Sequence, residues 1–261
     1  MRIFVFLTVL TCVSIAQPTP ATEARASSAP ILIELFTSDG CSSCPPVDDW
    51  LQQLVKSQPI PGGELILLSE HVDYFNHDGW QDPYSSGLFT NRQSAYARTM
   101  GLPSPYTPQV IVNGKGELRL NDPQEMNQML LKAARPLVVP VTISAMSVEG
   151  DSPATFRAHI EADGVAEKHN ADVYAAVALG HAESEVLRGE NGGRHLTHVD
   201  VVEELIKIGK LEKGKSFSQD FQAKLKPGTD PRNLRLIVFV QETGLGEVVG
   251  AALQQNGDSP R

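Results

Sequence analysis

Two cysteines three residues apart, Cys41 and Cys44, carry the clearest chemistry in this sequence. The sequence holds three cysteines, and the third, Cys12, lies in an N-terminal stretch that reads as an export signal. An exported chain that loses this stretch keeps two cysteines, which an oxidising compartment normally pairs. Because a bridge across so short a loop constrains the unfolded chain little, stability explains it poorly. We therefore expect a redox-active disulfide.

The position of the pair predicts which sulfur reacts. A short apolar run of strand type precedes the cysteines, and an amphipathic helix begins near Cys44. At the start of a helix, free backbone N–H groups and the positive end of the helix dipole stabilise a thiolate. We expect Cys41 to be the nucleophile and Cys44, one helical turn later, to resolve the mixed disulfide. A permanent disulfide in a module that only binds a partner is one alternative.

A second candidate element is the pair Thr107 and Pro108, directly before another short strand-type run. Proline lacks a backbone N–H, so it cannot donate a hydrogen bond to a neighbouring strand. Beside a disulfide, a cis Thr107-Pro108 bond would leave the backbone of Thr107 free to pair with an extended substrate. We expect these two residues to bind the partner.

Three further residues are candidates for proton transfer or for tuning of the sulfur atoms. Glu34 lies on the first predicted strand, where burial would raise its pKa and let it act as a base for Cys44. The alternative is an ordinary strand residue that faces solvent, or a carboxylate that only accepts hydrogen bonds. His71 and Asp73 follow the second predicted strand, at the sheet edge where α/β folds place ligand sites. We expect them to hold this loop or to tune Cys41 by hydrogen bonding.

The same loop suggests a different chemistry, because cysteine and histidine together suit copper or zinc. A metal-handling protein that uses Cys41, Cys44 and His71 is therefore a further alternative, although we expect neither a resident metal nor another cofactor. The histidines and aspartates of this loop are His71, Asp73, His77, Asp78 and Asp82.

Up to Pro136, the elements that must position these residues alternate between strand and helix. Turn and cap residues separate a strand, a helix, a strand, a helix, two strands and a final helix. With right-handed crossovers, this order packs helices on a mixed sheet. The predicted ranges are 31–36, 45–55, 64–70, 85–100, 110–112, 117–120 and 123–134.

Beyond Pro136, short and often alternating apolar segments are typical of an antiparallel β-sandwich. Residues 199–208 are ambiguous, and we favour a strand. A polar group in this half is expected to be a structural hydrogen-bond network, with a binding or catalytic role as the alternative; its members are Glu190, Asn191, His195 and His198.

The length, the net charge and the N-terminal residues indicate which class of protein this chain belongs to. The 261 residues, 41% hydrophobic and 20% charged, suit a globular chain of one or two domains. A formal charge of −9 argues against nucleic acid as a partner. Residues 1–16 read as a cleavable signal peptide, too short for a comfortable membrane span, with an uncleaved or lipidated anchor as the alternative. We expect a periplasmic or extracellular protein with a flexible leader at 17–30 and a tail at 256–261; the sequence predicts no particular oligomeric state.

The order strand, Cys-x-x-Cys, helix and later Thr-Pro, strand resembles the thioredoxin superfamily over roughly residues 30–135. More narrowly, several segments are similar to a family of uncharacterised secreted bacterial proteins with a thioredoxin-like domain: 34–46, 71–74, 79–83, 106–109, 188–191 and 196–198. The resemblance implies a thioredoxin-like fold and a cis Thr107-Pro108 bond, and it supplies no substrate. Together with the alternating segments beyond Pro136, we expect an α/β thioredoxin-like domain at 31–136 followed by a β-sandwich domain at 137–255. We expect the protein to be an exported thiol–disulfide oxidoreductase that exchanges with a protein or a small thiol.

Overall fold

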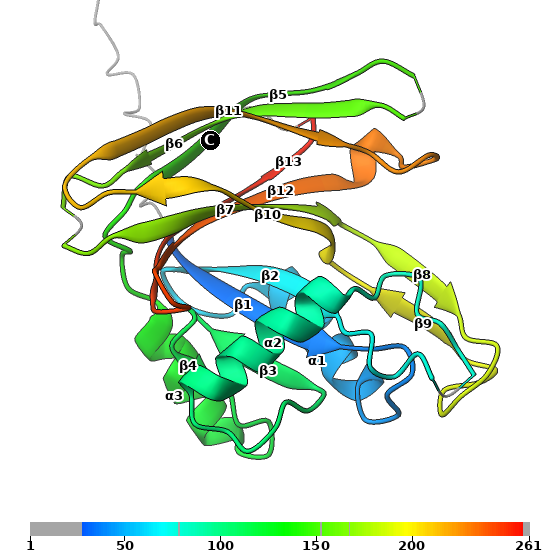
Figure 1. Cartoon of the computed structure of the whole chain (residues 1–261). Coiled ribbons are helices and arrows are strands. Elements are labelled where there is room, and N and C mark those ends of the chain that lie inside the picture. Colours follow the sequence, from blue (N-terminus) through cyan, green and yellow to red (C-terminus); the bar gives the residue numbers. More distant parts are fainter. Residues whose placement is uncertain (1–27, 78, 152, 167, 258–261) are drawn as a thin grey trace, which may run out of the picture.

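The computed structural model describes residues 28–77, 79–151, 153–166 and 168–257. The expected signal peptide, most of the leader, the end of the tail and Asp78 lie outside the described residues. One eight-stranded sheet dominates the described part, in the order β13-β12-β7-β10-β2-β1-β3-β4 (Figure 1). None of the helices in the described ranges is long and apolar enough to cross a membrane.

The first half of the chain has the predicted order of elements. Strand β1 pairs in parallel with β2 and antiparallel with β3, and β3 pairs with β4. Proline follows the Cys44 N-cap at the start of α1, the Ser86 side chain caps α2, and the Asp122 carboxylate caps α3. The elements are β1 (Ala29–Thr37), α1 (Pro45–Ser57), β2 (Gly63–His71), α2 (Gly87–Thr99), β3 (Gln109–Val112), β4 (Gly116–Glu117) and α3 (Pro123–Ala133).

The second half consists mainly of strands, and the ambiguous segment is the strand β10, as favoured. Strands β11, β6 and β5 form a three-stranded sheet, and β8 and β9 form a two-stranded hairpin. The elements are β5 (Val141–Glu149), β6 (Thr155–Asp163), β7 (Ala171–Leu179), β8 (Ala182–Glu185), β9 (His195–His198), β10 (Val201–Leu211), β11 (Ser216–Lys224), the 3-10 helix η1 (Pro231–Asn233), β12 (Leu234–Glu242) and β13 (Val248–Gln255).

The expected fold class, an α/β thioredoxin-like domain followed by a β-sandwich domain, is wrong. Strand β10 pairs in parallel with β2, at Val201 and Ser69, so β7, β10, β12 and β13 continue the sheet of the first half. The result is a mostly β protein with one large mixed sheet that runs across the expected boundary at 136/137. An apolar strand that is buried on both faces must pack against other elements on each face. Its sequence does not show whether those elements are helices or strands, so the expected boundary between two domains was wrong.

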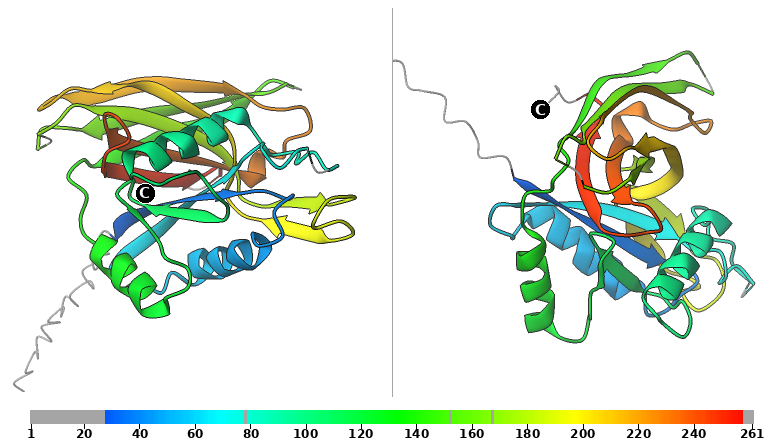
Figure 2. Two further views of the ribbon diagram at one scale, coloured as in Figure 1. Left: turned by 60° about the horizontal axis from the view of Figure 1, so that its bottom comes forward. Right: turned by 60° about the vertical axis from the view of Figure 1, so that its left-hand side comes forward.

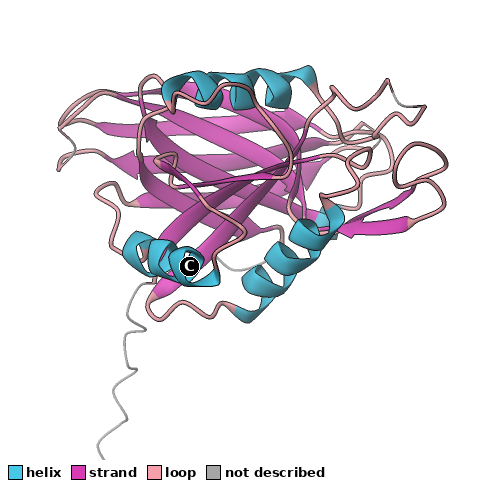
Figure 3. Ribbon diagram, turned by 90° about the horizontal axis from the view of Figure 1, so that it is seen from below, coloured by secondary structure: helices cyan, strands magenta, loops and turns pink. Residues whose placement is uncertain are grey.

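The side chains that pack on the two faces of β1 show how the two halves of the chain combine. Ile31, Ile33 and Leu35 pack against α1 and α3, whereas Leu32, on the other face, packs in a cluster with Phe239 and other residues of β7, β12 and β13. The sheet coils so strongly that β1 contacts β13 although many strands separate them. Figure 2 shows the resulting layers, and Figure 3 shows the helices on the outer side of the strands.

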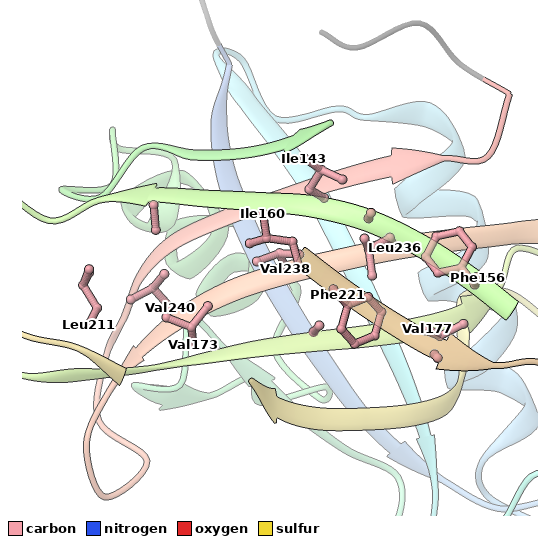
Figure 4. Close-up of a cluster of buried hydrophobic side chains, with 14 of the residues drawn as sticks. Ile143, Phe156, Ile160, Val173, Val177, Leu211, Phe221, Leu236, Val238 and Val240 are labelled. Atoms are coloured by element: carbon pink, nitrogen blue, oxygen red, sulfur yellow. The ribbon is translucent and has the colours of Figure 1, made fainter. Parts of the chain in front are cut away.

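A third layer covers the outer face of the second half. Strands β5, β6 and β11 pack over β7 and β12 through a large apolar cluster. In Figure 4, Ile160 of β6 points toward Val238 of β12, and Phe221 of β11 lies near Val177 of β7. These three strands therefore form a layer over the large sheet and are not one half of a separate sandwich domain.

Most of the candidate site residues lie at the sheet edge where β1 and β2 end. Thr37 and His71 are register partners at the ends of these parallel strands. The hairpin β8–β9 projects beyond the sheet toward the same edge (Figure 1), and β9 contacts α1. Residues from both halves of the chain therefore meet here.

Candidate redox site

Cys41 and Cys44 form a disulfide, with their Cα atoms 5.4 Å apart. The turn is closed by the Cys44 N–H, which donates to the Cys41 carbonyl over 3.2 Å. The carbonyl of Cys44 then accepts from the N–H groups of Val47 and Asp48 and starts helix α1. The predicted pairing at the start of a helix is therefore present.

Both sulfur-bearing residues are buried, in contrast to what an open active site requires. Cys41 is 2% exposed and Cys44 is 0% exposed, while Ser42 and Ser43 between them are exposed. The turn thus presents its serines outward and its disulfide inward. A partner's sulfur has no direct approach in this conformation.

Part of this cover is the loop 186–194 between β8 and β9, which we name the hairpin loop. The Asn191 amide donates to the carbonyls of Asp39 (2.8 Å) and Cys41 (2.9 Å). The Glu190 carboxylate accepts from the Ser42 N–H over 2.9 Å. The polar group that we expected to be a structural network in the second half thus binds the cysteine turn of the first half.

A second set of polar residues, the His–Asp cluster (Asp39, His71, Asp82 and His198), lies buried at the ends of β1 and β2. His71 Nδ1 donates to Asp82 (2.8 Å), and His198 Nε2 donates to Asp39 (3.0 Å). The two imidazole rings meet edge to face, with centroids 4.8 Å apart. The Asp39 N–H also donates to Asp82, and the Trp80 indole N–H donates to Asp39. The cluster is thereby fastened to the cysteine turn.

The charges of this cluster follow from its pairing. Burial by itself lowers the pKa of His71, but Asp82, Asp39 and Asp48 more than offset it and raise the pKa to about 9. Burial would raise the pKa of Asp82, but His71 and two backbone N–H groups hold it below its ordinary value. His71 and Asp82 are thus a charged pair at neutral pH.

Asp48, which the sequence reasoning missed, is a buried carboxyl four residues after Cys44, and its N–H donates to the Cys44 carbonyl. It lies on α1 and is 8% exposed, and its carboxylate accepts from the Thr37 hydroxyl over 3.0 Å. Burial raises its pKa to about 6, although His198 and His71 oppose this rise. The signal was present in the sequence, because residues four apart share one face of a helix.

Glu34, the acid that the sequence suggested as a base for Cys44, lies elsewhere. It projects from the face of β1 that is opposite to α1, where it accepts from Arg92 Nε (2.6 Å) and the Tyr96 hydroxyl (2.6 Å) of α2. Arg92 also lies 3.6 Å from Glu70. The structure therefore places Glu34 in a buried ion pair and does not bring it to the disulfide.

Asp73 is fastened to helix α2. Its carboxylate accepts from the Thr90 hydroxyl over 2.6 Å, and its N–H donates to the same hydroxyl. Of the two roles expected for this residue, the contacts correspond to holding the loop.

Thr107 and Pro108 lie at the same sheet edge as the disulfide. Their peptide bond is cis, as expected. Gln109 pairs with Phe36 in the antiparallel register of β3 and β1, which puts Pro108 opposite Thr37. Tyr106, just before them, is 47% exposed. Their role in binding a partner stays a prediction.

A metal ion could be held, among the described residues, by Asp39, His71 and Asp82, whose ligand atoms lie within 4.8 Å of one another. In the structure these atoms already have hydrogen-bond partners, since His71 is bonded to Asp82 and the Asp39 carboxylate accepts from His198. Cys41 and Cys44 are bonded to each other, so neither offers a thiolate to a metal in this oxidised form.

The comparisons with known proteins cover most of the chain. A family model described as Protein of unknown function (DUF1223) matches residues 32–241. No curated protein matches the chain. A structural-genomics protein from Agrobacterium tumefaciens is similar in structure, with 24% identity, a TM-score of 0.67 and coverage of 89% of this chain and 96% of that one. HBP35 of Porphyromonas gingivalis is similar with 14% identity, a TM-score of 0.65 and coverage of 89% and 76%. These likenesses show the fold, and they extend over both halves of the chain.

Proposed function

The chain belongs to the DUF1223 family, and from this premise we propose that it is an exported protein that exchanges its Cys41–Cys44 disulfide with a protein or small thiol. The observation that carries the proposal is the buried carboxyl of Asp48, one helical turn after Cys44. Its pKa, raised by burial to about 6, suits a group that gives and takes a proton near neutral pH. A purely structural disulfide releases no thiolate and needs no such group.

The exchange is a displacement at Cys41. A partner thiolate attacks Cys41 Sγ, the bond to Cys44 breaks, and a mixed disulfide forms between the partner and Cys41. The electron pair of the broken bond passes to Cys44 Sγ, which takes a proton from Asp48. In the reverse direction the Asp48 carboxylate takes this proton back, and the Cys44 thiolate attacks Cys41 and releases the partner's thiolate.

The surroundings of Asp48 support this role. A hollow of about 70 Å³ lies beside Asp48 and His198 and is lined also by Arg194 and His195 of the second half. Through it, the buried carboxyl can exchange its proton with solvent between turnovers. Thr107 and Pro108, at the same sheet edge, are the proposed contacts for the partner's backbone.

The burial of both sulfurs adds a condition to the proposal. Because Cys41 is 2% exposed and the hairpin loop is bonded to its turn, the hairpin loop must move before a partner's sulfur can attack. A closed resting state of this kind protects the disulfide from indiscriminate thiols.

The test is a trapping experiment with Cys44→Ser. We expect the reduced variant, mixed with oxidised glutathione, to form a lasting mixed disulfide through Cys41, visible by mass spectrometry. Cys41→Ser is the matched control, and it should react far more slowly because Cys41, at the start of the helix, is the sulfur expected to form the reactive thiolate. Equal and slow reaction of both variants would contradict the proposal.

The burial of the two sulfurs also favours a second candidate, a partner-binding module with a permanent disulfide. A titration of the wild-type protein in glutathione or dithiothreitol redox buffers separates the two. A reduction potential below about −300 mV would favour the permanent disulfide, since structural disulfides of secreted proteins lie in that range. A higher potential supports exchange.

A further inference from the structure

The backbone N–H groups around Cys41 determine how well its thiolate is stabilised. In a Cys-x-x-Cys turn, N–H groups near the first sulfur lower the pKa of that thiol. Here the first N–H after Cys41, that of Ser42, already donates to the Glu190 carboxylate at 2.9 Å. This donor is therefore occupied by an anion that comes from 148 residues further along the chain.

The Glu190 carboxylate also brings a full negative charge to the turn. Hydrogen bonds from Ser42 lower the pKa of Glu190, so that it is ionised at neutral pH. A second negative charge on Cys41 Sγ, one residue away from the bonded N–H, is disfavoured by Coulomb repulsion. Reduction of the disulfide creates this charge and oxidation removes it.

Glu190 is held at this place by its neighbour. Asn191 is 1% exposed, and its amide donates to the carbonyls of Asp39 and Cys41. Arg194 donates to the Asn191 side-chain oxygen over 2.8 Å, which orients the amide toward the cysteine turn. The position of the Glu190 charge is thus built into the hairpin loop.

We propose that Glu190 is a positioning residue for the redox chemistry of Cys41: it raises the energy of the Cys41 thiolate and thereby favours the disulfide over the dithiol. The inference rests on the proposed function for its biological use, but it concerns an equilibrium that can be measured without any partner. It makes the second half of the chain a determinant of the reduction potential of the first.

The test compares Glu190→Gln with the wild type. Glutamine keeps an oxygen that accepts from the Ser42 N–H and removes the charge. We expect a lower Cys41 pKa, measured by the pH dependence of iodoacetamide alkylation of reduced protein. In dithiothreitol or glutathione buffers, the equilibrium constant for reduction should rise about three- to tenfold, as for one charge near the protein surface. A tenfold change is about 30 mV.

The matched control is Glu185→Gln, which removes a charge from the same hairpin, at a side chain 76% exposed and bonded to His195. It should leave the Cys41 pKa and the potential within error of the wild type. At about 1 M salt, where the Debye length is about 3 Å, the differences in Cys41 pKa and in reduction potential between Glu190→Gln and the wild type should shrink. If the substitution acted only by loosening the hairpin loop, these differences would not depend on salt in this way.

An unchanged Cys41 pKa in Glu190→Gln, or an equal change in Glu185→Gln, would overturn the inference. So would a shift that persists fully in high salt. If Cys44→Ser forms no mixed disulfide while Glu190→Gln still shifts the equilibrium, the exchange function fails and the tuning stands. If trapping succeeds and the equilibrium does not shift, the tuning alone fails.

Discussion

Asp48 is a carboxyl whose burial opposes its own ionisation. Its pKa of about 6 lies above the ordinary value of 3.8. The folded protein therefore holds the Asp48 proton more tightly than the unfolded chain does, and the ionised form destabilises the fold at neutral pH. Such a cost is typical of residues that a site uses for proton transfer.

We expect Asp48→Asn to raise stability and slow exchange. At pH 7 the free energy of unfolding should rise by about 3 kcal/mol, because the variant has no buried charge to form. The gain should shrink as the pH falls below 6 and vanish near pH 4, which urea unfolding at several pH values can follow. Resolution of the mixed disulfide should slow on the order of a hundredfold.

The exposed neighbour Asp49 provides the control for this prediction. Asp49→Asn removes the same charge from the same helix and should change neither stability nor exchange appreciably. A loss of stability in Asp48→Asn at pH 7 would mean that the carboxylate is stabilised by its neighbours instead of opposed by burial.

His71 has the opposite linkage to pH. Its pKa of about 9 lies above the ordinary value of 6.5, because Asp82 stabilises the charged ring against the cost of burial. The stabilisation is fully present below pH 6.5 and is lost as the pH rises through 9. We expect the free energy of unfolding to fall by about 3 kcal/mol over this range, measured by urea unfolding. In His71→Gln this fall should be absent, whereas in a variant of the exposed His195 (His195→Gln) it should remain.

At the scale of elements, the hairpin β8–β9 depends on its contacts for its position. Its strands pair with each other and form a sheet separate from the eight-stranded one. A two-stranded hairpin is at best marginally stable alone. Its anchors are Asn191 and Glu190 at the cysteine turn, His198 at Asp39 and the Tyr84 hydroxyl, which donates to its backbone.

Loosening the hairpin loop should expose the disulfide. We expect Asn191→Ala to speed reduction of the disulfide by dithiothreitol about thirtyfold, because two buried hydrogen bonds of about 1 kcal/mol each are lost. The rate can be followed by the appearance of free thiols. Glu183→Ala, an exposed change on the same hairpin, is the control. An unchanged rate in Asn191→Ala would show that something other than the hairpin loop limits access.

At the scale of the molecule, one buried cation joins the two halves. Arg92 of α2 donates to Glu34 of β1 and to Gln241 of β12. Glu70, next to this group, has a pKa well above its ordinary value, mainly through burial and the neighbouring Glu34 charge. Together with the pairing of β2 and β10, this contact predicts that the halves unfold as one unit.

The two tryptophans test this prediction, because Trp50 and Trp80 both lie in the first half. We expect urea unfolding followed by tryptophan fluorescence to coincide with unfolding followed by far-UV circular dichroism, which reports mainly on the strands of the whole chain. Arg92→Met should lower both midpoints together and reduce the free energy of unfolding by roughly 3 kcal/mol or more, since it leaves the buried Glu34 carboxylate without its cation. Two separated transitions would instead support independent halves.

The sequence by itself determined the local features of this protein. The apolar run before the cysteines, the helix that starts after Cys44 and the capped helix after Asp122 all formed, because periodicity, prolines and cap residues act between near neighbours. The same locality made the Cys41–Cys44 disulfide predictable.

Only the tertiary structure decided what surrounds that disulfide. Asn191 and His198 reach the cysteine turn from 150 and 159 residues away. Glu34 pairs with Arg92 of α2 instead of reaching the disulfide, and β10 extends the sheet that helices were expected to enclose. The type of a side chain shows that it needs an apolar neighbour or a hydrogen-bond partner, but it does not show which distant residue supplies it. The partner is determined when the whole chain packs, by which apolar faces and polar groups become buried against each other.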